Sequence, residues 1–532
     1  MTELTAGSLL ALFVAVPLLS AGLSVIFRHR VLDRVLLVGV PALAVAGGVA
    51  LMLFHREVPV VATAIGSFEG GIAIPLVSDM LTALMLATTG LATAAAGWFL
   101  ALTGEARLRF VPALALLLMT GVNGALLTGD LFNLFVFVEV MLLPSYALIA
   151  VTGTWRRLGL GRMFVIVNLV TSLILLMGVG LVYGSAGTVN LAALAGQAAE
   201  DPQVALAVTI VLVALAIKAG VVPVHGWLPR AYSGTSAGIM ALFSALHTKV
   251  SLYAIFRIYF TAFEPGTTPA GASGAVGTSA PGSGMAETVA VVIAVVVLVT
   301  MVLGALGSLG EQRFRGVLAF QMVAGVGHIL IGAAVASPVA VTAGLFYLVH
   351  HVITVASLLT TVGAVEHTYG TGVLGRLSGV MHRDRLAAVL VALGLLSLAG
   401  LPPTSGLWGK LGLGLAVADS GADGPAWQAP VFLVAIVVSS LVTLVALQRL
   451  WGGSFAGAPL RRYWPAAPAG GRDGVRPLDS TVRIPLRLLG PGVVMMGVSV
   501  ALFVFAGVLM PFIDSATAGL FDTGPYIEAV LP

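Results

Sequence analysis

The sequence contains no cysteine and very little charge. Only 9% of its 532 residues are Asp, Glu, Lys or Arg, whereas a soluble globular domain carries about 25% charged residues. The absence of cysteine excludes disulfides, thiolate metal sites and cysteine-ligated iron–sulfur clusters. Because 59% of the residues are hydrophobic, the composition predicts an all-α integral membrane protein.

Apolar stretches long enough to cross a bilayer, roughly 20 residues each, recur along the whole chain. They predict fourteen transmembrane helices. The first is not expected to be a cleaved signal peptide, because it follows Glu3 rather than a basic stretch and its apolar run exceeds about 7–15 residues. The segments are centred near Val14, Leu43, Ala87, Leu118, Leu142, Ile174, Ile210, Leu246, Val296, Gly325, Thr354, Leu396 to Leu411, Val438 and Val500.

Basic residues appear in every second predicted loop. By the positive-inside rule these loops are cytoplasmic and both termini face outside. The net charge of +4 therefore reflects topology rather than nucleic-acid binding. The basic loops contain Arg28, Arg30 and Arg34; Arg107 and Arg109; Arg156, Arg157 and Arg162; Arg230; Arg313 and Arg315; Arg376, Arg383 and Arg385; and the arginines from Arg449 to Arg487.

Lysine is nearly absent, and the three lysines avoid the loops. Lys218, Lys249 and Lys410 all fall inside predicted membrane segments. Snorkelling accounts for lysines near helix ends, but Lys218 and Lys249 lie about fifteen residues into their segments. We therefore expect the lysines to be functional.

One carboxylate, Glu139, lies in the middle of the apolar stretch LFNLFVFVEVMLLPSYALIA (131–150). A charge at the bilayer centre costs roughly 2.5–3.5 kcal/mol on insertion scales, and such residues usually serve function. The alternative is a structural hydrogen bond to a neighbouring helix.

Two predicted helices, the seventh and the twelfth, are interrupted by proline, which removes a backbone donor and clashes with the preceding turn. Pro223 interrupts the seventh, and Pro402 and Pro403 interrupt the twelfth. Their separation by five helices indicates two five-helix repeats, of which the second is inverted because the number is odd. The expected organisation is N-terminal helices (1–105), first repeat (106–262), flexible loop (263–286), second repeat (287–451), and a cytoplasmic interfacial segment with the last helix (452–532).

Histidines complete the set of buried titratable groups. His247 accompanies Lys249, His328 lies on the tenth predicted helix, and His350 and His351 lie on the eleventh. A lone membrane histidine is often a packing residue, and this alternative stays open for His328. The sequence has no metal-binding, phosphate-binding or nucleophile motif, so we expect no cofactor. Groups that accept and release protons on six helices indicate proton transfer through the membrane.

Three stretches also resemble a known family: GDLFNLFVFVEVMLLPSYALIA (129–150), IKAGVVPVHGWLPRAYSGTSAGIMALFSALHTKVSLYAIFR (217–257) and GLPPTSGLWGKLGL (400–413). They resemble the antiporter-like subunits shared by respiratory complex I and Mrp-type multisubunit cation (Na+)/proton antiporters. The first stretch is similar to the D subunits of the Mrp systems. The resemblance covers the third to thirteenth predicted helices and implies fourteen helices with two inverted five-helix repeats.

The resemblance also implies roles for single residues. Glu139 and Lys218 match an ion pair of the family, and Lys249 and Lys410 match its lysines on the eighth and twelfth helices. Relatives often carry a further lysine near Val355, so the centre of the relay here must depend on His350, His351 or water.

These observations predict a proton-translocating subunit of a multisubunit Na+/H+ antiporter in the cell membrane, with other hydrophobic subunits as partners. Protons would pass from Lys218 to Lys249, through the histidines and on to Lys410, each charge repelling the next. We expect these groups in a row at similar membrane depth.

Two alternatives stay open. One is the homologous pump module of a complex I-like NADH:quinone oxidoreductase or membrane-bound hydrogenase, with the redox chemistry in other subunits. The other is a stand-alone transporter of small organic substrates. The second is disfavoured because the buried polar residues are nearly all titratable. The basic stretch 450–487 is expected to lie at the cytoplasmic interface or to contact a partner subunit.

Overall fold

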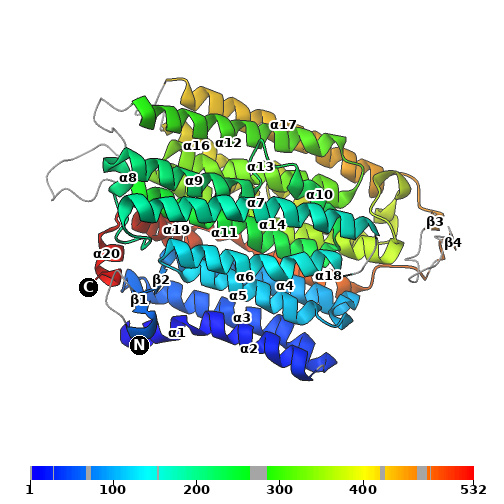
Figure 1. The fold of residues 1–532 in the computed structure, drawn as a ribbon. Helices are drawn as coiled ribbons and strands as arrows, with labels where there is room; N and C mark the ends of the chain where they lie inside the picture. The colour runs from blue at the N-terminus through cyan, green and yellow to red at the C-terminus, as the bar shows by residue number, and fades with distance from the viewer. Residues whose placement is uncertain are drawn as a thin grey trace.

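The computed structural model describes residues 3–27, 29–67, 73–151, 155–263, 284–419, 426–463, 476–479 and 481–531. Most of the predicted flexible loop 263–286 and part of the basic stretch 450–487 therefore lie outside the described residues. The described chain is mostly helical, and its long helices run side by side (Figure 1).

The elements follow one another along the chain in this order: α1 (Glu3–Leu10), α2 (Leu12–Phe27), α3 (Arg30–Phe54), β1 (Val60–Ala64), β2 (Pro75–Asp79), α4 (Met80–Thr103), α5 (Val111–Leu127), α6 (Leu131–Ala150), α7 (Trp155–Ala186), α8 (Gln197–Glu200), α9 (Pro202–Ala219), α10 (Trp227–Gly234), α11 (Ala237–Phe263), α12 (Gly284–Gly310), α13 (Phe314–Val335), α14 (Pro338–Tyr369), α15 (Arg385–Ala399), α16 (Gly406–Asp419), α17 (Gln428–Ser454), β3 (Arg462–Tyr463), β4 (Arg476–Pro477), α18 (Leu486–Val504), α19 (Ala506–Phe521) and α20 (Gly524–Val530).

Twelve helices of the described chain are long and apolar enough to cross a membrane. Three further apolar helices, α5, α15 and α19, are only 17, 15 and 16 residues long. Each of the fourteen predicted segment centres lies in a helix. The chain is thus a multi-pass membrane protein, and the count of fourteen stays a prediction because α5 is short and α15 stops at a break.

The two proline-containing segments separate helices in the same way. α9 ends at Gly220 (φ 84°) and α15 ends at Gly400 (φ 88°), and a left-handed backbone of this kind favours glycine. The residue after each glycine closes the helix with the same hydrogen bond. Val221 N–H donates to Ala216 O at 3.0 Å, and Leu401 N–H donates to Leu396 O at 2.9 Å. α10 and α16 then follow the breaks.

α11, α13 and α14 form the centre of the bundle. Their membrane-spanning windows are 100%, 94% and 89% buried, whereas those of the outer helices α3 and α7 are only 39% buried. α14 packs against α4, α11, α13, α16 and α18. The two helices that carry His247, Lys249, His350 and His351 are therefore among the most enclosed in the molecule.

The two ends of the bundle carry different structures (Figure 1). The antiparallel hairpin β1–β2, the short helix α20 and both chain termini lie at one end, and the short pair β3–β4 lies at the other. Termini on the same side require an even number of crossings.

Candidate functional site

All three lysines are buried between helices. Lys218, Lys249 and Lys410 are 4%, 0% and 8% exposed, respectively. Each ammonium contacts a side chain from another helix: Lys218 reaches Ser172 on α7, Lys249 reaches α14 and Lys410 reaches α17. Among the described residues, no carboxylate lies within 4.0 Å of any lysine ammonium. The lysines therefore lie inside the protein and none points to lipid.

Glu139, Ser172 and Lys218 form the first cluster, from α6, α7 and α9. Lys218 Nζ donates to Ser172 Oγ at 2.9 Å, and Ser172 Oγ donates to Glu139 Oε1. The resemblance implied an ion pair of Glu139 with Lys218, and here a serine hydroxyl stands between the two charges. Ser172 carries no signal of its own in the sequence, because a serine in an apolar helix commonly bonds to its own backbone.

Lys249 and His351 form the central contact. Lys249 Nζ lies 3.3 Å from His351 Nδ1 and 3.2 Å from the hydroxyl of Thr248. The contact joins α11, in the predicted first repeat, to α14, in the predicted second. Val355 lies one helical turn beyond His351 and is buried. With no lysine at this position, the histidine itself is the partner of Lys249.

His350, the neighbour of His351, points toward the second break. Its Nδ1 lies 2.8 Å from Ser405 Oγ, and its buried Nε2 has no hydrogen-bond partner among the described residues. A Cβ added to Gly406 would lie 3.1 Å from His350 Cε1, so the ring edge faces the start of α16. His350 Nε2 is thus a possible proton donor or acceptor beside the helix that carries Lys410.

Tyr347 connects the histidines of this region. Its ring centroid lies 5.1 Å from that of His328, 5.2 Å from that of His350 and 6.1 Å from that of His351. Tyr347 was not among the predicted site residues. A signal was present, because tyrosine precedes the histidine pair by one helical turn and so shares a helix face with His351.

Lys410 and His328 are held by two consecutive serines of α17. Lys410 Nζ donates to Ser440 Oγ at 2.8 Å, and His328 Nε2 lies 3.2 Å from Ser439 Oγ. The stem of Lys410 packs over Gly400, where an added Cβ would lie 2.7 Å from Lys410 Cδ. The second break therefore positions Lys410 by close contact.

His247 has no hydrogen bond to a lysine among the described residues. Its Nε2 lies 2.7 Å from Ser145 Oγ and its Nδ1 lies 3.0 Å from Tyr232 OH, so neutral hydroxyls engage both nitrogens. The ring also packs against Phe243, with centroids 4.6 Å apart. Of the candidate residues, His247 has the environment most typical of a packing histidine.

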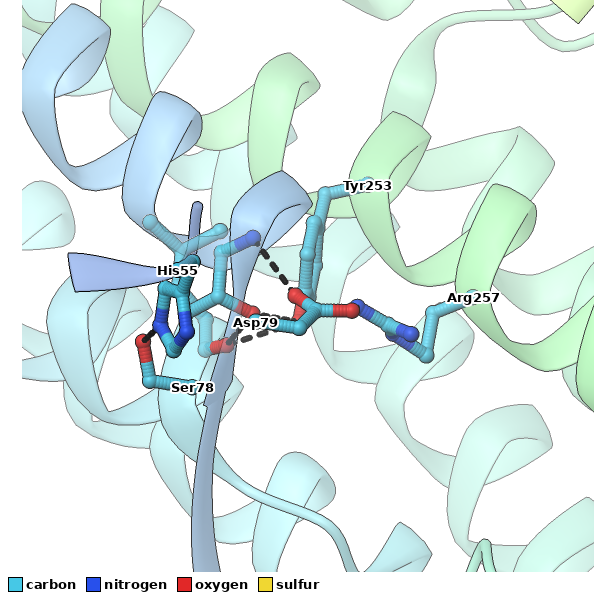
Figure 2. Close-up of polar contacts among 7 residues, drawn as sticks. His55, Ser78, Asp79, Tyr253 and Arg257 are labelled. Atoms are coloured by element: carbon cyan, nitrogen blue, oxygen red, sulfur yellow. Dashed lines mark hydrogen bonds and ion pairs between the residues drawn. The ribbon is translucent and has the colours of Figure 1, made fainter. Parts of the chain in front are cut away.

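A further buried polar cluster was missed by the sequence analysis (Figure 2). Asp79, the N-cap of α4, forms an ion pair with Arg257 on α11, and both side chains are buried. His55, after the end of α3, bonds to Ser78. Burial alone would raise the pKa of Asp79, but the charge of Arg257 lowers it below its ordinary value. Burial lowers the pKa of His55. The missed signal was Arg257 within the apolar run SLYAIFRIYF.

Metal ligands do not gather in the described part of the chain. No group of three or more His, Asp or Glu side chains there could hold a metal ion. The contacts of the lysines are hydroxyls and imidazoles, which suit hydrogen bonding and proton exchange.

The sequence matches the model of a known protein family. The model of the family described as NADH:quinone oxidoreductase/Mrp antiporter, TM, matches residues 128–443, which is more than half of the chain and includes every candidate residue from Glu139 to Lys410. The chain belongs to this family. The matched region therefore holds the three lysines and the histidines His247, His328, His350 and His351.

Similar members of the family come from two kinds of complex. The D subunit of a Na(+)/H(+) antiporter from Bacillus subtilis is 29% identical over 97% of this chain and 98% of its own length. The N subunit of a NADH-quinone oxidoreductase from Desulforudis audaxviator is 32% identical over 72% of this chain and 73% of its own. In the structure of the Mrp complex from Dietzia sp., one chain matches with a TM-score of 0.88 and 40% identity, covering 99% of both chains.

Proposed function

We propose that this chain is the D-type, proton-translocating subunit of a multisubunit Na+/H+ antiporter of the Mrp kind. The full-length similarity to the Bacillus subtilis antiporter subunit and the 40% identity to a chain of the Dietzia Mrp complex support this assignment. The chain is a transporter subunit of the cell membrane, its partners are the other membrane subunits of the complex, and its substrates are protons and Na+.

The alternative is a pump module in a complex I-like oxidoreductase or a membrane-bound hydrogenase. The relative from Desulforudis audaxviator fits it, but that match covers less of the chain, and the structural match at 40% identity is to the Mrp complex. Purification of the native complex separates the two, since an antiporter contains small hydrophobic subunits and a redox complex contains flavin or iron–sulfur subunits. An antiporter also exchanges Na+ for protons without NADH.

The proposed membrane arrangement has fourteen helices and two inverted five-helix repeats, α5 to α11 and α12 to α17. The matching glycine turns at Gly220 and Gly400 support the repeats, because both breaks end a helix with the same hydrogen bonds. The common position of both termini in Figure 1 supports an even number of crossings. With the arginine pattern, both termini face outside.

The proposed mechanism is a relay of protons between the lysines. Protonated Lys218 is stabilised by Glu139 through Ser172. A charge on Lys218 disfavours a charge on Lys249, which passes its proton to His351. From there the proton reaches His350 and Lys410 at similar membrane depth. Steps longer than a hydrogen bond pass through water.

The observation that carries the relay is the 3.3 Å contact between Lys249 and His351. It is a direct donor–acceptor contact between the two predicted repeats, and both of its residues can bind and release a proton. A relay that crosses from one repeat to the other needs such a contact near its middle.

Na+-driven proton exchange in everted membrane vesicles tests the proposal. Lys249→Ala and His351→Ala should each abolish exchange while the complex still assembles. The matched control is Ser244→Ala on α11, because Ser244 is also buried and, among the described residues, its hydroxyl bonds only to Ala241 O of its own helix. Normal exchange in Lys249→Ala at wild-type expression would contradict the relay.

A further inference from the structure

Figure 2 shows the Asp79–Arg257 pair. Asp79 is the last residue of β2, so the pair lies toward the end of the bundle that carries the β1–β2 hairpin and the termini (Figure 1). The guanidinium carbon of Arg257 lies 5.7 Å from the centroid of the Tyr253 ring and 5.2 Å from that of Tyr526. A buried ion pair loses the hydration of both charges, so it is weak evidence for a contribution to stability. Stability alone is therefore a weak explanation for the pairing of these two charges.

α11 connects this pair to Lys249. Lys249, Tyr253 and Arg257 are spaced four residues apart and share one face of the helix. At a rise of 1.5 Å per residue, Arg257 lies about 12 Å along the axis from Lys249. Tyr253 lies between them, so the face presents a polar side chain at each turn.

Thr82 joins the tyrosine to the ion pair. Tyr253 OH donates to Leu126 O at 2.7 Å and lies 2.9 Å from Thr82 Oγ1. The backbone N–H of Thr82 donates to Asp79 Oδ1 at 2.9 Å. Polar groups of α4 and α11 thus follow one another from the neighbourhood of Lys249 to the Asp79–Arg257 pair.

His55 and Tyr526 cover the pair toward the end of the molecule. They are only 3% and 4% exposed, although they belong to the connection after α3 and to the short helix α20. His55 Nε2 lies 2.9 Å from Ser78 Oγ and its Nδ1 lies 2.8 Å from Val58 O. The pair is therefore closed off from the aqueous phase in this structure.

We propose that the face of α11 from Lys249 to Arg257 is an extracytoplasmic access route for protons to Lys249, and that the Asp79–Arg257 pair is its gate. The proposal rests on the function proposed above, in which Lys249 carries protons. A guanidinium fixed on such a route repels hydronium, as an arginine does in pores that exclude protons. Asp79 holds the guanidinium in the route, and the rings of Tyr253 and Tyr526 pack against it.

The double variant Asp79→Asn/Arg257→Gln tests the gate in the assembled complex. It removes both charges and keeps amide groups of similar size, so it avoids the unpaired buried charge that each single variant would leave. We expect a proton leak: a pH gradient across everted vesicles should decay several-fold faster than in wild type without added Na+. A decay rate equal to wild type would overturn the proposal.

The matched control is Arg315→Gln/Glu366→Gln. This is the other ion pair of the described residues, at 2.8 Å between α13 and α14, and its arginine belongs to a predicted cytoplasmic loop. We expect no leak from it. A leak of the same size in this control would overturn the proposal, because it would make the leak a general effect of losing an ion pair.

A second measurement uses the absence of cysteine. Thr82→Cys places one thiol of this chain on the Lys249 side of the pair. A membrane-impermeant thiol reagent on the extracytoplasmic side should label Cys-substituted position 82 several-fold faster in the double variant than in Thr82→Cys alone. If the double variant does not assemble, labelling of Thr82→Cys alone decides: faster labelling in energised than in de-energised membranes supports the gate, and equal labelling overturns it.

Lys249→Ala separates this proposal from the function on which it rests. Normal Na+/H+ exchange in Lys249→Ala contradicts the relay itself. Inactive Lys249→Ala together with wild-type leak and labelling in the double variant contradicts the gate alone.

Discussion

The two broken helices share a backbone pattern and differ in how they hold their lysines. Lys218 lies two residues before Gly220, and Ser172 links it to Glu139. Lys410 lies ten residues after Gly400, and the hydrogen bond of its ammonium goes to Ser440. Lys218 is thus linked to a carboxylate through one hydroxyl, whereas among the described residues the hydroxyl that binds Lys410 has no hydrogen bond to a carboxylate.

The two breaks therefore share their backbone geometry and differ in the charges that their lysines are linked to. A nearby opposite charge stabilises the ionised form of a buried group, whereas burial among neutral groups disfavours it. We therefore expect the first half of the molecule to depend on charge at a fixed position. The second half should depend on how precisely the break places its lysine.

The largest effect is expected at Glu139. Glu139→Gln keeps the size and the hydrogen bond with Ser172 but removes the charge that stabilises Lys218. Na+/H+ exchange in everted vesicles should fall at least roughly a hundredfold, the range for loss of a proton-transfer group. The comparison is His328→Gln in the second half, which should lose much less. Wild-type Na+/H+ exchange in Glu139→Gln at normal assembly would show that the charge of Glu139 is not needed for transport.

Replacing each lysine by arginine should give the next largest effects on transport, and these effects should differ between the two breaks. An arginine keeps a positive charge but does not release its proton, so it fails wherever the proton must leave. Lys218→Arg should fail nearly as completely as Lys218→Ala, and Lys249→Arg likewise. Lys410→Arg should retain more exchange, because its site lies toward the predicted exit. Robust exchange in all three arginine variants, measured at equal assembly, would show that these lysines act as fixed charges only.

The serines that hold the lysines should give smaller effects. Ser172→Ala removes the hydroxyl between Lys218 and Glu139, and Ser440→Ala removes the hydroxyl on Lys410. We expect a several-fold loss of exchange in Ser172→Ala and a smaller loss in Ser440→Ala, because only the first disconnects two charges. Ser244→Ala serves as the control for a buried serine. Equal losses at both serines would argue against the electrostatic difference between the halves.

The turn glycines should give the smallest effects on transport. Alanine in the left-handed conformation costs roughly 1–2 kcal/mol of stability at either position. At Gly220 the new Cβ would lie 2.7 Å from the flexible end of Leu228, whereas at Gly400 it would lie 2.7 Å from Lys410 Cδ and 3.2 Å from Lys410 Cβ. Thermal unfolding should therefore shift similarly in both variants, and exchange should fall further in Gly400→Ala. A larger loss of exchange in Gly220→Ala would contradict this placement of Lys410.

Sequence patterns predicted the helical segments and the buried lysines well, because both follow from hydropathy. A segment that crosses lipid must be a long apolar helix, and a lysine within it is stable only beside a polar group or water. The hydroxyl partners of Lys218 and Lys410 were not predictable. Ser172 and Ser440 are ordinary residues in membrane helices, and only the packing of distant segments makes them contacts.

The Asp79–Arg257 pair was missed for a related reason. Asp79 precedes a helix and reads as an N-cap, which it also is, since its side chain accepts from Thr82 N–H. Arg257 lies near the end of a predicted membrane segment, where basic residues are common. Neither position identifies its partner, because the two residues are far apart in the sequence and meet only when α4 packs against α11.

His350 and His351 are consecutive on one unbroken helix of 32 residues, and they contact different segments: His350 contacts Ser405 and His351 contacts Lys249. Successive side chains of an α-helix point about 100° apart, so a stiff helix moves both rings as one body. An axial turn of about 20° would carry ring nitrogens, roughly 6 Å from the axis, by about 2 Å. Such a turn would change both contacts at once, that of His351 with Lys249 and that of His350 with Ser405. The two contacts are therefore mechanically coupled: rotation of α14 cannot change the one at His351 without changing the one at His350.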